Sequence, residues 1–287
     1  MRNLPFVGEF RLSMTEALRT QLLATLDALE WTPLTSENLD LLNERGGVYQ
    51  LALDQHPVYV GKSAKALARR LGKHHHKLRG RFDASEPESK NPLIERTSFR
   101  CVYVDEDLGS VAPEKMLMRE LGARGESEWN NAGFGNNDPG RQRDTSLVKE
   151  QHFDRRYPIN LEVPLTLKLP QSPDLQASTL MKIVKSDLPF LFRHSAPPAE
   201  CAADWVPLPS NGAPARDWFE AIASILPAGW KTVALLGYVI SYPDVVVSKY
   251  ASRTGAWVST GGGAEWVQHH PQFDRSAIDS EPVTDDQ

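Results

Sequence analysis

The chain contains little cysteine and no long run of apolar residues. Cys101 and Cys201 are the only two cysteines among 287 residues. Two thiols so far apart indicate neither a disulfide framework nor a zinc motif, and they favour buried cysteines in a reducing cytosol. No segment is apolar enough to span a bilayer, and the first residues lack the apolar run of a signal peptide. We therefore expect a cytoplasmic protein with no membrane partner.

The chain also lacks a strong charge of one sign, since its formal net charge is only -5. This average argues mildly against general nucleic-acid binding, but it hides an asymmetry. Residues 62–81 contain no acidic residue, and their basic side chains are Lys62, Lys65, Arg69, Arg70, Lys73, Lys77, Arg79 and Arg81. A local basic patch can bind DNA on an acidic protein, because the local field acts on the phosphates.

Two alternating apolar runs, over residues 47–53 and 58–61, precede this basic segment. The four residues between them, 54–57, have the composition of a turn, so the pattern predicts a β-hairpin. Each strand presents one tyrosine, Tyr49 or Tyr59. Two strand tyrosines that lead into a basic segment can hold a phosphate diester.

The basic segment itself predicts a helix over residues 63–78, with Ser63 as its N-cap. Arg70 and His74 are four residues apart and therefore share a face of this helix. Arg70 can donate two parallel hydrogen bonds to a phosphate, and His74 can exchange a proton or hold a tyrosine hydroxyl. Three consecutive histidines do not share a helix face, so we do not expect a zinc site here.

A carboxylate and an amide further along the chain complete the candidate set. Glu114 is a hard oxygen ligand suited to Mg²⁺, although an acid in the first turn of a helix also has a purely structural explanation. Glu120 is an alternative carboxylate. Asn130 or Asn131 can pin a loop or a phosphate by hydrogen bonds.

The rest of the sequence predicts mixed helices and strands. We expect helices over 15–29, 110–121 and 215–226, strands over 99–104, 161–170, 231–242 and 244–250, a Gly/Asn-rich functional loop over 129–145 and a glycine turn at 261–263.

These motifs resemble the GIY-YIG nuclease superfamily. The triplets at 47–49 and 59–61 carry the resemblance, and residues 114–118 are similar to its Glu-x-x-Leu-Ile signature, with Met118 in place of isoleucine. One branch is especially similar, the type II restriction endonucleases that are isoschizomers of SacII. Its similar stretches are residues 47–51, 58–62, 70–74, 102–108 and 133–141, within about 33–164.

The resemblance implies an α+β fold with a GIY-YIG core, a small antiparallel sheet flanked by helices. We expect an N-terminal helix and arm over 1–40, the core with its Gly/Asn-rich loop over 41–168, a C-terminal α/β extension over 169–275 and a disordered tail over 276–287.

The resemblance also implies Mg²⁺-dependent hydrolysis of double-stranded DNA at a GC-rich palindrome, CCGCGG, by a homodimer with a cognate methyltransferase as its functional partner. By this resemblance, Tyr49 would be the general base or a relay to it, and Tyr59 would bind the phosphate. Arg70 would stabilise the transition state, and His74 would orient or deprotonate Tyr49. Glu114 would hold the single metal, and Asn130 would be the terminal asparagine, with Asn131 left open as the alternative. The candidate DNA contacts are Lys62, Lys73, Lys77, Arg79, Arg81, Arg141 and Arg143. The alternatives are a structure-selective repair nuclease and a catalytically silent DNA-binding module.

Overall fold

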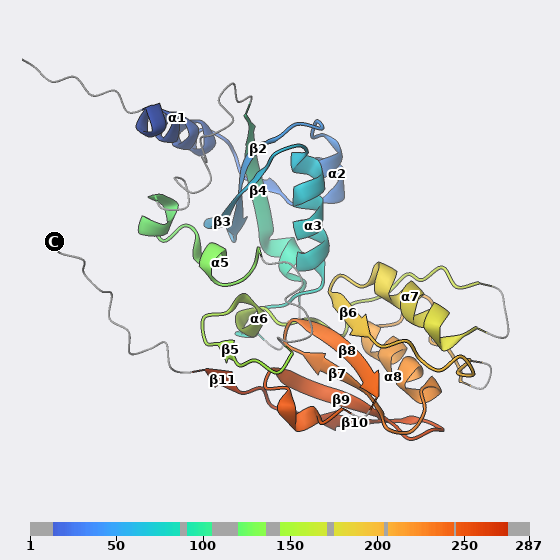
Figure 1. Ribbon diagram of the computed structural model, residues 1–287. Helices are drawn as coiled ribbons and strands as arrows, with labels where there is room; N and C mark the ends of the chain where they lie inside the picture. Colours follow the sequence, from blue (N-terminus) through green and yellow to red (C-terminus); the bar gives the residue numbers. More distant parts are fainter. Residues whose placement is uncertain are drawn as a thin grey trace, which may run out of the picture. The chain divides into compact units, whose positions relative to one another are not determined.

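The computed structural model shows a mixed α+β protein with a four-stranded antiparallel sheet and a five-stranded mixed sheet, which confirms the predicted α+β class (Figure 1). It describes residues 14–86, 91–104, 120–135, 144–170, 175–203, 206–243 and 245–274. The contacts divide the chain into an N-terminal unit, residues 1–72 with 96–131, and a C-terminal unit, residues 73–95 with 132–287. Residues 41–168, expected as one core, are thus shared between both units.

The four-stranded sheet belongs to the N-terminal unit and has the strand order β1-β4-β2-β3. Its strands are β1 (Thr32–Pro33), β2 (Gly47–Leu53), β3 (His56–Ser63) and β4 (Thr97–Tyr103), and the helices of the unit are α1 (Met14–Asp27), α2 (Ser36–Asp40) and α5 (Glu128–Asn131). The predicted hairpin and the predicted third strand are confirmed. Helix α3 (Leu67–Arg79) begins in this unit, and the division between the units falls within it.

The two faces of this sheet are used differently, as the alternation of side chains along a strand requires. Val48 and Val60 point to one face, where they pack with Leu22 and Leu26 of α1. The tyrosines point to the other face, from which the Tyr49 hydroxyl accepts a hydrogen bond from Arg70 in the first turn of α3. Figure 1 shows α1 and the start of α3 on opposite sides of this sheet.

The turn within the hairpin is shorter than predicted, and the connection from the hairpin to the helix is longer. The loop consists of Asp54 and Gln55 alone, at φ 49° and 68°, which is the left-handed pair of a type I′ turn. Ser63 ends β3 and does not cap the helix. Its hydroxyl accepts the N–H of Ala66 at 3.2 Å, and α3 begins only at Leu67.

The five-stranded sheet of the C-terminal unit has the order β10-β9-β7-β8-β6, with only β6 and β8 running parallel. Its strands are β6 (Leu191–His194), β7 (Trp230–Leu235), β8 (Tyr238–Pro243), β9 (Arg253–Ser259) and β10 (Ala264–Gln268). A two-stranded parallel pair, β5 (Val148–Lys149) with β11 (Phe273–Asp274), and the helices α6 (Phe153–Arg156), α7 (Ala177–Asp187) and α8 (Ala215–Ile225) complete the unit; the 3-10 turns are η1 (Leu93–Arg96) and η3 (Val247–Lys249).

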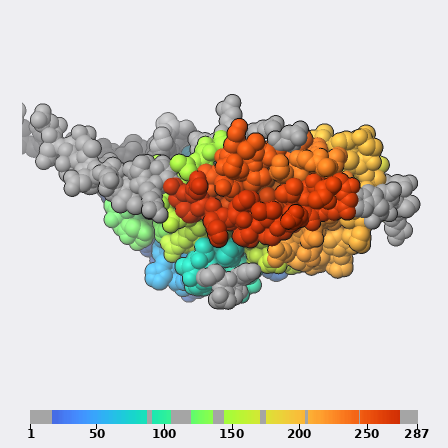
Figure 2. Space-filling view, turned by 90° about the horizontal axis from the view of Figure 1, so that it is seen from below, coloured from blue at the N-terminus to red at the C-terminus, as the bar shows by residue number. Residues whose placement is uncertain are grey.

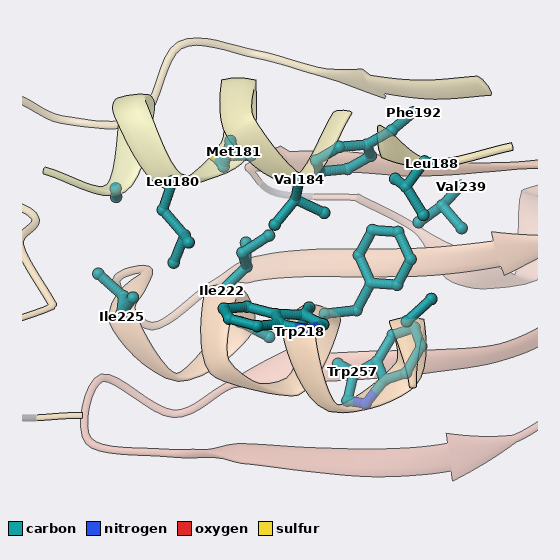
Figure 3. Close-up of a cluster of buried hydrophobic side chains, with 14 of the residues drawn as sticks. Leu180, Met181, Val184, Leu188, Phe192, Trp218, Ile222, Ile225, Val239 and Trp257 are labelled. Carbon is teal, nitrogen blue, oxygen red and sulfur yellow. The ribbon is translucent and has the colours of Figure 1, made fainter. Parts of the chain in front are cut away.

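Helices α7 and α8 cover this sheet with an apolar core (Figure 3). Leu180 and Val184 of α7 lie above Trp218 and Ile222 of α8, and Trp257 of β9 lies beneath them. The apolar spacing along α8 predicted this helix correctly. Residues near the end of the described chain form a continuous exposed band (red in Figure 2), to which the mostly exposed strand β10 belongs.

Three strand predictions in this unit need correction. Residues 231–242 form a hairpin of two strands, and residues 244–250 contain the 3-10 turn η3 in place of a strand. Residues 161–170 alternate between buried and exposed side chains but make only an isolated bridge between Pro164 and Pro214. Backbone groups of Val163 and Leu165 bond to Ala215, Ala213 and Gly212 around this bridge. The partner segment turns into α8 at Ala215, so the pairing stops before a strand forms. Within the described residues, no helix is long and apolar enough to cross a membrane.

Candidate active site

Tyr49 and Tyr59 lie side by side on one face of the β2–β3 hairpin. The register pairs Tyr49 with Gly61 and Leu51 with Tyr59, so the tyrosines are diagonal neighbours. Their ring centroids are 6.1 Å apart. The two triplets that stand out in the sequence thus meet in space, with Gly61 opposite Tyr49.

Gly61 makes this arrangement sterically possible. A Cβ atom at this position would lie 2.5 Å from Cζ of Tyr49 and 2.9 Å from Cε1 of Tyr59. Both distances are shorter than real Cβ contacts, and the obstacles are rigid rings. Any larger residue would therefore push the tyrosine pair off the strand.

Arg70 joins the pair from the first turn of α3. Its Nε donates to the hydroxyl of Tyr49 at 3.3 Å, and Tyr59 lies within hydrogen-bonding reach of both side chains. Burial, followed by the neighbouring Tyr59, raises the pKa of Tyr49 well above its ordinary value of about 10, against the opposing effect of Arg70. Tyr49 is therefore neutral at physiological pH, and it must lose its own proton to act as a base.

Asn130 of α5 binds the backbone of β3 between Tyr59 and Gly61. Its amide Nδ2 donates to the carbonyl of Val60 at 2.7 Å, and its Oδ1 accepts the N–H of Val60 at 2.9 Å. Because β3 is an outer strand of the sheet, Asn130 satisfies backbone groups that a further strand would otherwise bind. Asn131 is exposed. Of the two asparagines left open by the sequence, Asn130 is the one in contact with the tyrosine-bearing strand.

His74 lies one turn beyond Arg70 on α3, as predicted, and belongs to the C-terminal unit. It is 4% exposed, and its ring is stacked on Phe134 with centroids 4.8 Å apart. Phe134 comes from the Gly/Asn-rich loop. The sequence motif over residues 133–141 includes Phe134 without indicating a role for it. The only sequence feature that could have singled out Phe134 is its position between two glycines, Gly133 and Gly135.

The basic residues predicted to bind DNA divide into two groups. Lys62 and Lys73 are exposed. Lys77 donates to the carbonyl of Phe134 at 2.8 Å, and Arg79 donates to the carbonyl of Asp187 at 3.1 Å. The second pair is therefore engaged with the protein.

Arg81 requires a correction, because it is only 3% exposed. Its guanidinium binds the carboxylate of Asp154 at 2.8 Å and the carbonyls of Tyr157 and Gly237 at 2.9 and 3.0 Å. A buried guanidinium with these partners is part of the protein interior, so we do not carry Arg81 into the proposed DNA interface.

Glu114, Arg141 and Arg143 lie outside the described residues. Glu120, the alternative carboxylate, forms ion pairs with Arg19 and Arg124. The described part of the chain contains no cluster of three or more histidine, cysteine or acidic residues able to hold a metal. The assignment of Glu114 as the metal ligand therefore stays a prediction.

Neither a protein-family model nor a curated protein matches this chain.

Proposed function

We propose that the chain is a type II restriction endonuclease of the GIY-YIG kind, which hydrolyses double-stranded DNA with Mg²⁺. The observation that carries the proposal is the contact of Arg70 with the hydroxyl of Tyr49, beside Tyr59 and over Gly61. Two buried hydroxyls and a guanidinium on one side of a hairpin form a constellation that fits a phosphate diester. Packing alone does not require a guanidinium at this place.

In the proposed reaction a water oxygen attacks the scissile phosphorus, and the bond to the 3′ oxygen breaks. Tyr49 takes the proton of the attacking water, directly or as a relay, and Tyr59 hydrogen-bonds the phosphate. Arg70 stabilises the negative charge that builds up on the phosphate oxygens. Asn130 supports the strand that carries Tyr59, and the implied role of His74 is to orient or deprotonate Tyr49.

The proposed cofactor is a single Mg²⁺. One carboxylate together with substrate phosphate oxygens is a donor set that suits this ion, and Glu114 would supply the carboxylate. When bound, the ion would polarise the phosphate and support the leaving oxygen.

The proposed DNA contacts are the exposed basic residues at the start of α3 and just before it. Lys62 and Lys73 belong to this group, and so do the exposed Lys65 and Arg69, which precede Lys73 at intervals of four residues. We expect them to contact backbone phosphates, which position the duplex without reading its sequence. A six-base palindrome is read naturally by a two-fold symmetric homodimer, and a cognate methyltransferase would protect the host DNA.

The test is digestion of a plasmid of known sequence, with Mg²⁺ and with EDTA. Glu114→Ala is compared with Glu265→Ala, which removes an exposed carboxylate from β10. We expect discrete bands that require Mg²⁺, are lost in Glu114→Ala and persist in Glu265→Ala, with ends mapping to one GC-rich palindrome. A smear, or cleavage only of branched DNA, would favour a structure-selective nuclease. Retention of DNA in a gel shift without any cleavage would favour a silent binding module.

A further inference from the structure

The second half of α3 presents its basic side chains to a row of aromatic rings. His74 and Lys77 are three residues apart on α3, whereas Arg81 follows the end of the helix. Lys77 and Arg81 both lie over the ring of Phe153. The aromatic row consists of Phe134, Phe153 and Tyr157, with successive ring centroids 4.8 and 5.0 Å apart. These residues all belong to the C-terminal unit.

The first ring of the row holds the imidazole of His74. The planes of His74 and Phe134 are inclined by only 22°, and Phe134 is 1% exposed. A buried stack restricts rotation of the imidazole about its side-chain bonds. The stack occupies a face of the imidazole ring, whereas the two ring nitrogens lie at its edge.

Lys77 in turn holds Phe134. Its ammonium group donates to the carbonyl of Phe134 at 2.8 Å and lies 4.9 and 5.1 Å from the ring centroids of Phe134 and Phe153. One side chain thus fixes both the backbone and the ring of Phe134. The ammonium group of Lys77 is thus bound within the protein.

The turn before Phe134 adds a further constraint. Gly133 has φ +88°, a conformation that favours glycine, and a Cβ there would lie 2.5 Å from Nε2 of His152. The loop can therefore present Phe134 to α3 in this way only with glycine at position 133.

We propose that Phe134, locked by Lys77, is a positioning residue that orients the imidazole of His74 for DNA cleavage. This inference rests on the proposed nuclease function. It assigns the Gly-Phe-Gly part of the loop to the catalytic step and not to reading of the DNA sequence.

The test is single-turnover cleavage by the full chain at saturating enzyme, together with DNA affinity in Ca²⁺. We expect Phe134→Leu to slow cleavage at least about tenfold and to change affinity less than about threefold, because a misplaced catalytic group costs rate more than binding. Phe134→Tyr keeps the ring and should restore the rate. The matched control is Phe219→Leu, which removes an equally buried ring from α8. It should lower the unfolding temperature and leave the rate unchanged.

A double-mutant cycle shows whether Phe134 acts through His74. In a His74→Ala background, Phe134→Leu should cause no further loss, since the group that it positions is already gone. Additive losses, or an equal fall in affinity and rate, would overturn the inference. Where Phe134→Leu does not fold, Lys77→Met compared with Lys77→Arg gives the same readout. A wild-type chain that cuts no DNA would instead refute the proposed function.

Discussion

Gly61 has no side chain, and this leaves the space that the tyrosine pair of the candidate site needs. The ring of Tyr49 lies over this glycine, where Arg70 reaches its hydroxyl. The sequence predicts the two strands and their tyrosines, but not that the tyrosines share a face. The register of β2 and β3 shifts by one residue between Leu51 and Ala52, and without this shift Tyr49 would pair with Val60 and point away from Tyr59. The contact with Arg70 was not predictable, since it depends on where α3 begins relative to the sheet.

Substitution of Gly61 by alanine tests this packing. We expect Gly61→Ala to destabilise the chain by about 1–3 kcal/mol, as overpacking does, and to slow cleavage about a hundredfold because Tyr49 must move. Thermal unfolding and single-turnover cleavage measure the two effects. Gly72→Ala on α3 is the control, because its added Cβ would meet no side chain or neighbouring element within 4 Å among the described residues. It should leave cleavage unchanged and stabilise the chain by about 0.5–1 kcal/mol. Cleavage by Gly61→Ala at the wild-type rate would show that the position of the tyrosine pair does not matter for the reaction.

The titration of Tyr49 predicts a pH profile. Burial raises its pKa above the ordinary value of about 10, so its proton is retained across the neutral range. Cleavage at saturating DNA should therefore rise about tenfold per pH unit between about pH 6 and 8. The same raised pKa stabilises the folded chain below about pH 10 and ceases to do so as the pH rises further. A rate that is flat across the neutral range is incompatible with Tyr49 as the titrating group.

At the scale of elements, α5 completes the outer edge of the four-stranded sheet. Asn130 gives Val60 the two hydrogen bonds that a neighbouring strand would provide. Helix α8 and the hairpin were predictable from spacing and alternation, which are local. Helix α7 carries a similar spacing at Leu180, Met181 and Val184, which we did not interpret as a helix. Segment 161–170 was predicted as a strand because its alternation is real, but the segment that it pairs with continues as α8 after one bridge, which the local pattern does not show.

Removal of the Asn130 amide tests its role at this edge. We expect Asn130→Ala to cost about 1–3 kcal/mol of unfolding free energy, because the backbone groups of the buried Val60 lose their partners. Asn131→Ala, at the exposed neighbouring position, should change stability by less than about 0.5 kcal/mol. Denaturant unfolding of both variants measures the difference. Equal effects would show that the amide does not support β3.

At the scale of the whole molecule, the basic segment after the hairpin serves two purposes. Its first part is exposed, whereas Arg81 beyond α3 is buried among carbonyls far away in the sequence. A sequence pattern cannot show which basic residues are exposed and which are buried, because only the fold of the C-terminal unit brings the partners of Arg81 together. Gly237 contributes to this site, since a Cβ there would lie 2.8 Å from Cγ of Asp154.

The Arg81–Asp154 pair should dominate the acid stability of this unit. Burial alone would raise the pKa of Asp154, but the charges of Arg81 and Lys77 lower it overall. Its contribution is therefore complete above about pH 4 and is lost as the pH falls through the lowered pKa. We expect Arg81→Met to cost about 3–5 kcal/mol at pH 7. Asp154→Asn should also be less stable than the wild type at pH 7, by a margin that narrows below pH 4. A margin independent of pH would contradict this pairing.

The central claim is that the Tyr49 hydroxyl, held by Arg70, takes part in DNA cleavage. The most direct measurement is the Mg²⁺-dependent single-turnover cleavage rate of Tyr49→Phe beside Tyr103→Phe, which removes the hydroxyl of another tyrosine in the same sheet. We predict that Tyr49→Phe folds and binds DNA but cleaves at least about a hundredfold more slowly, while Tyr103→Phe cleaves like the wild type. Undiminished cleavage by folded Tyr49→Phe would contradict the account.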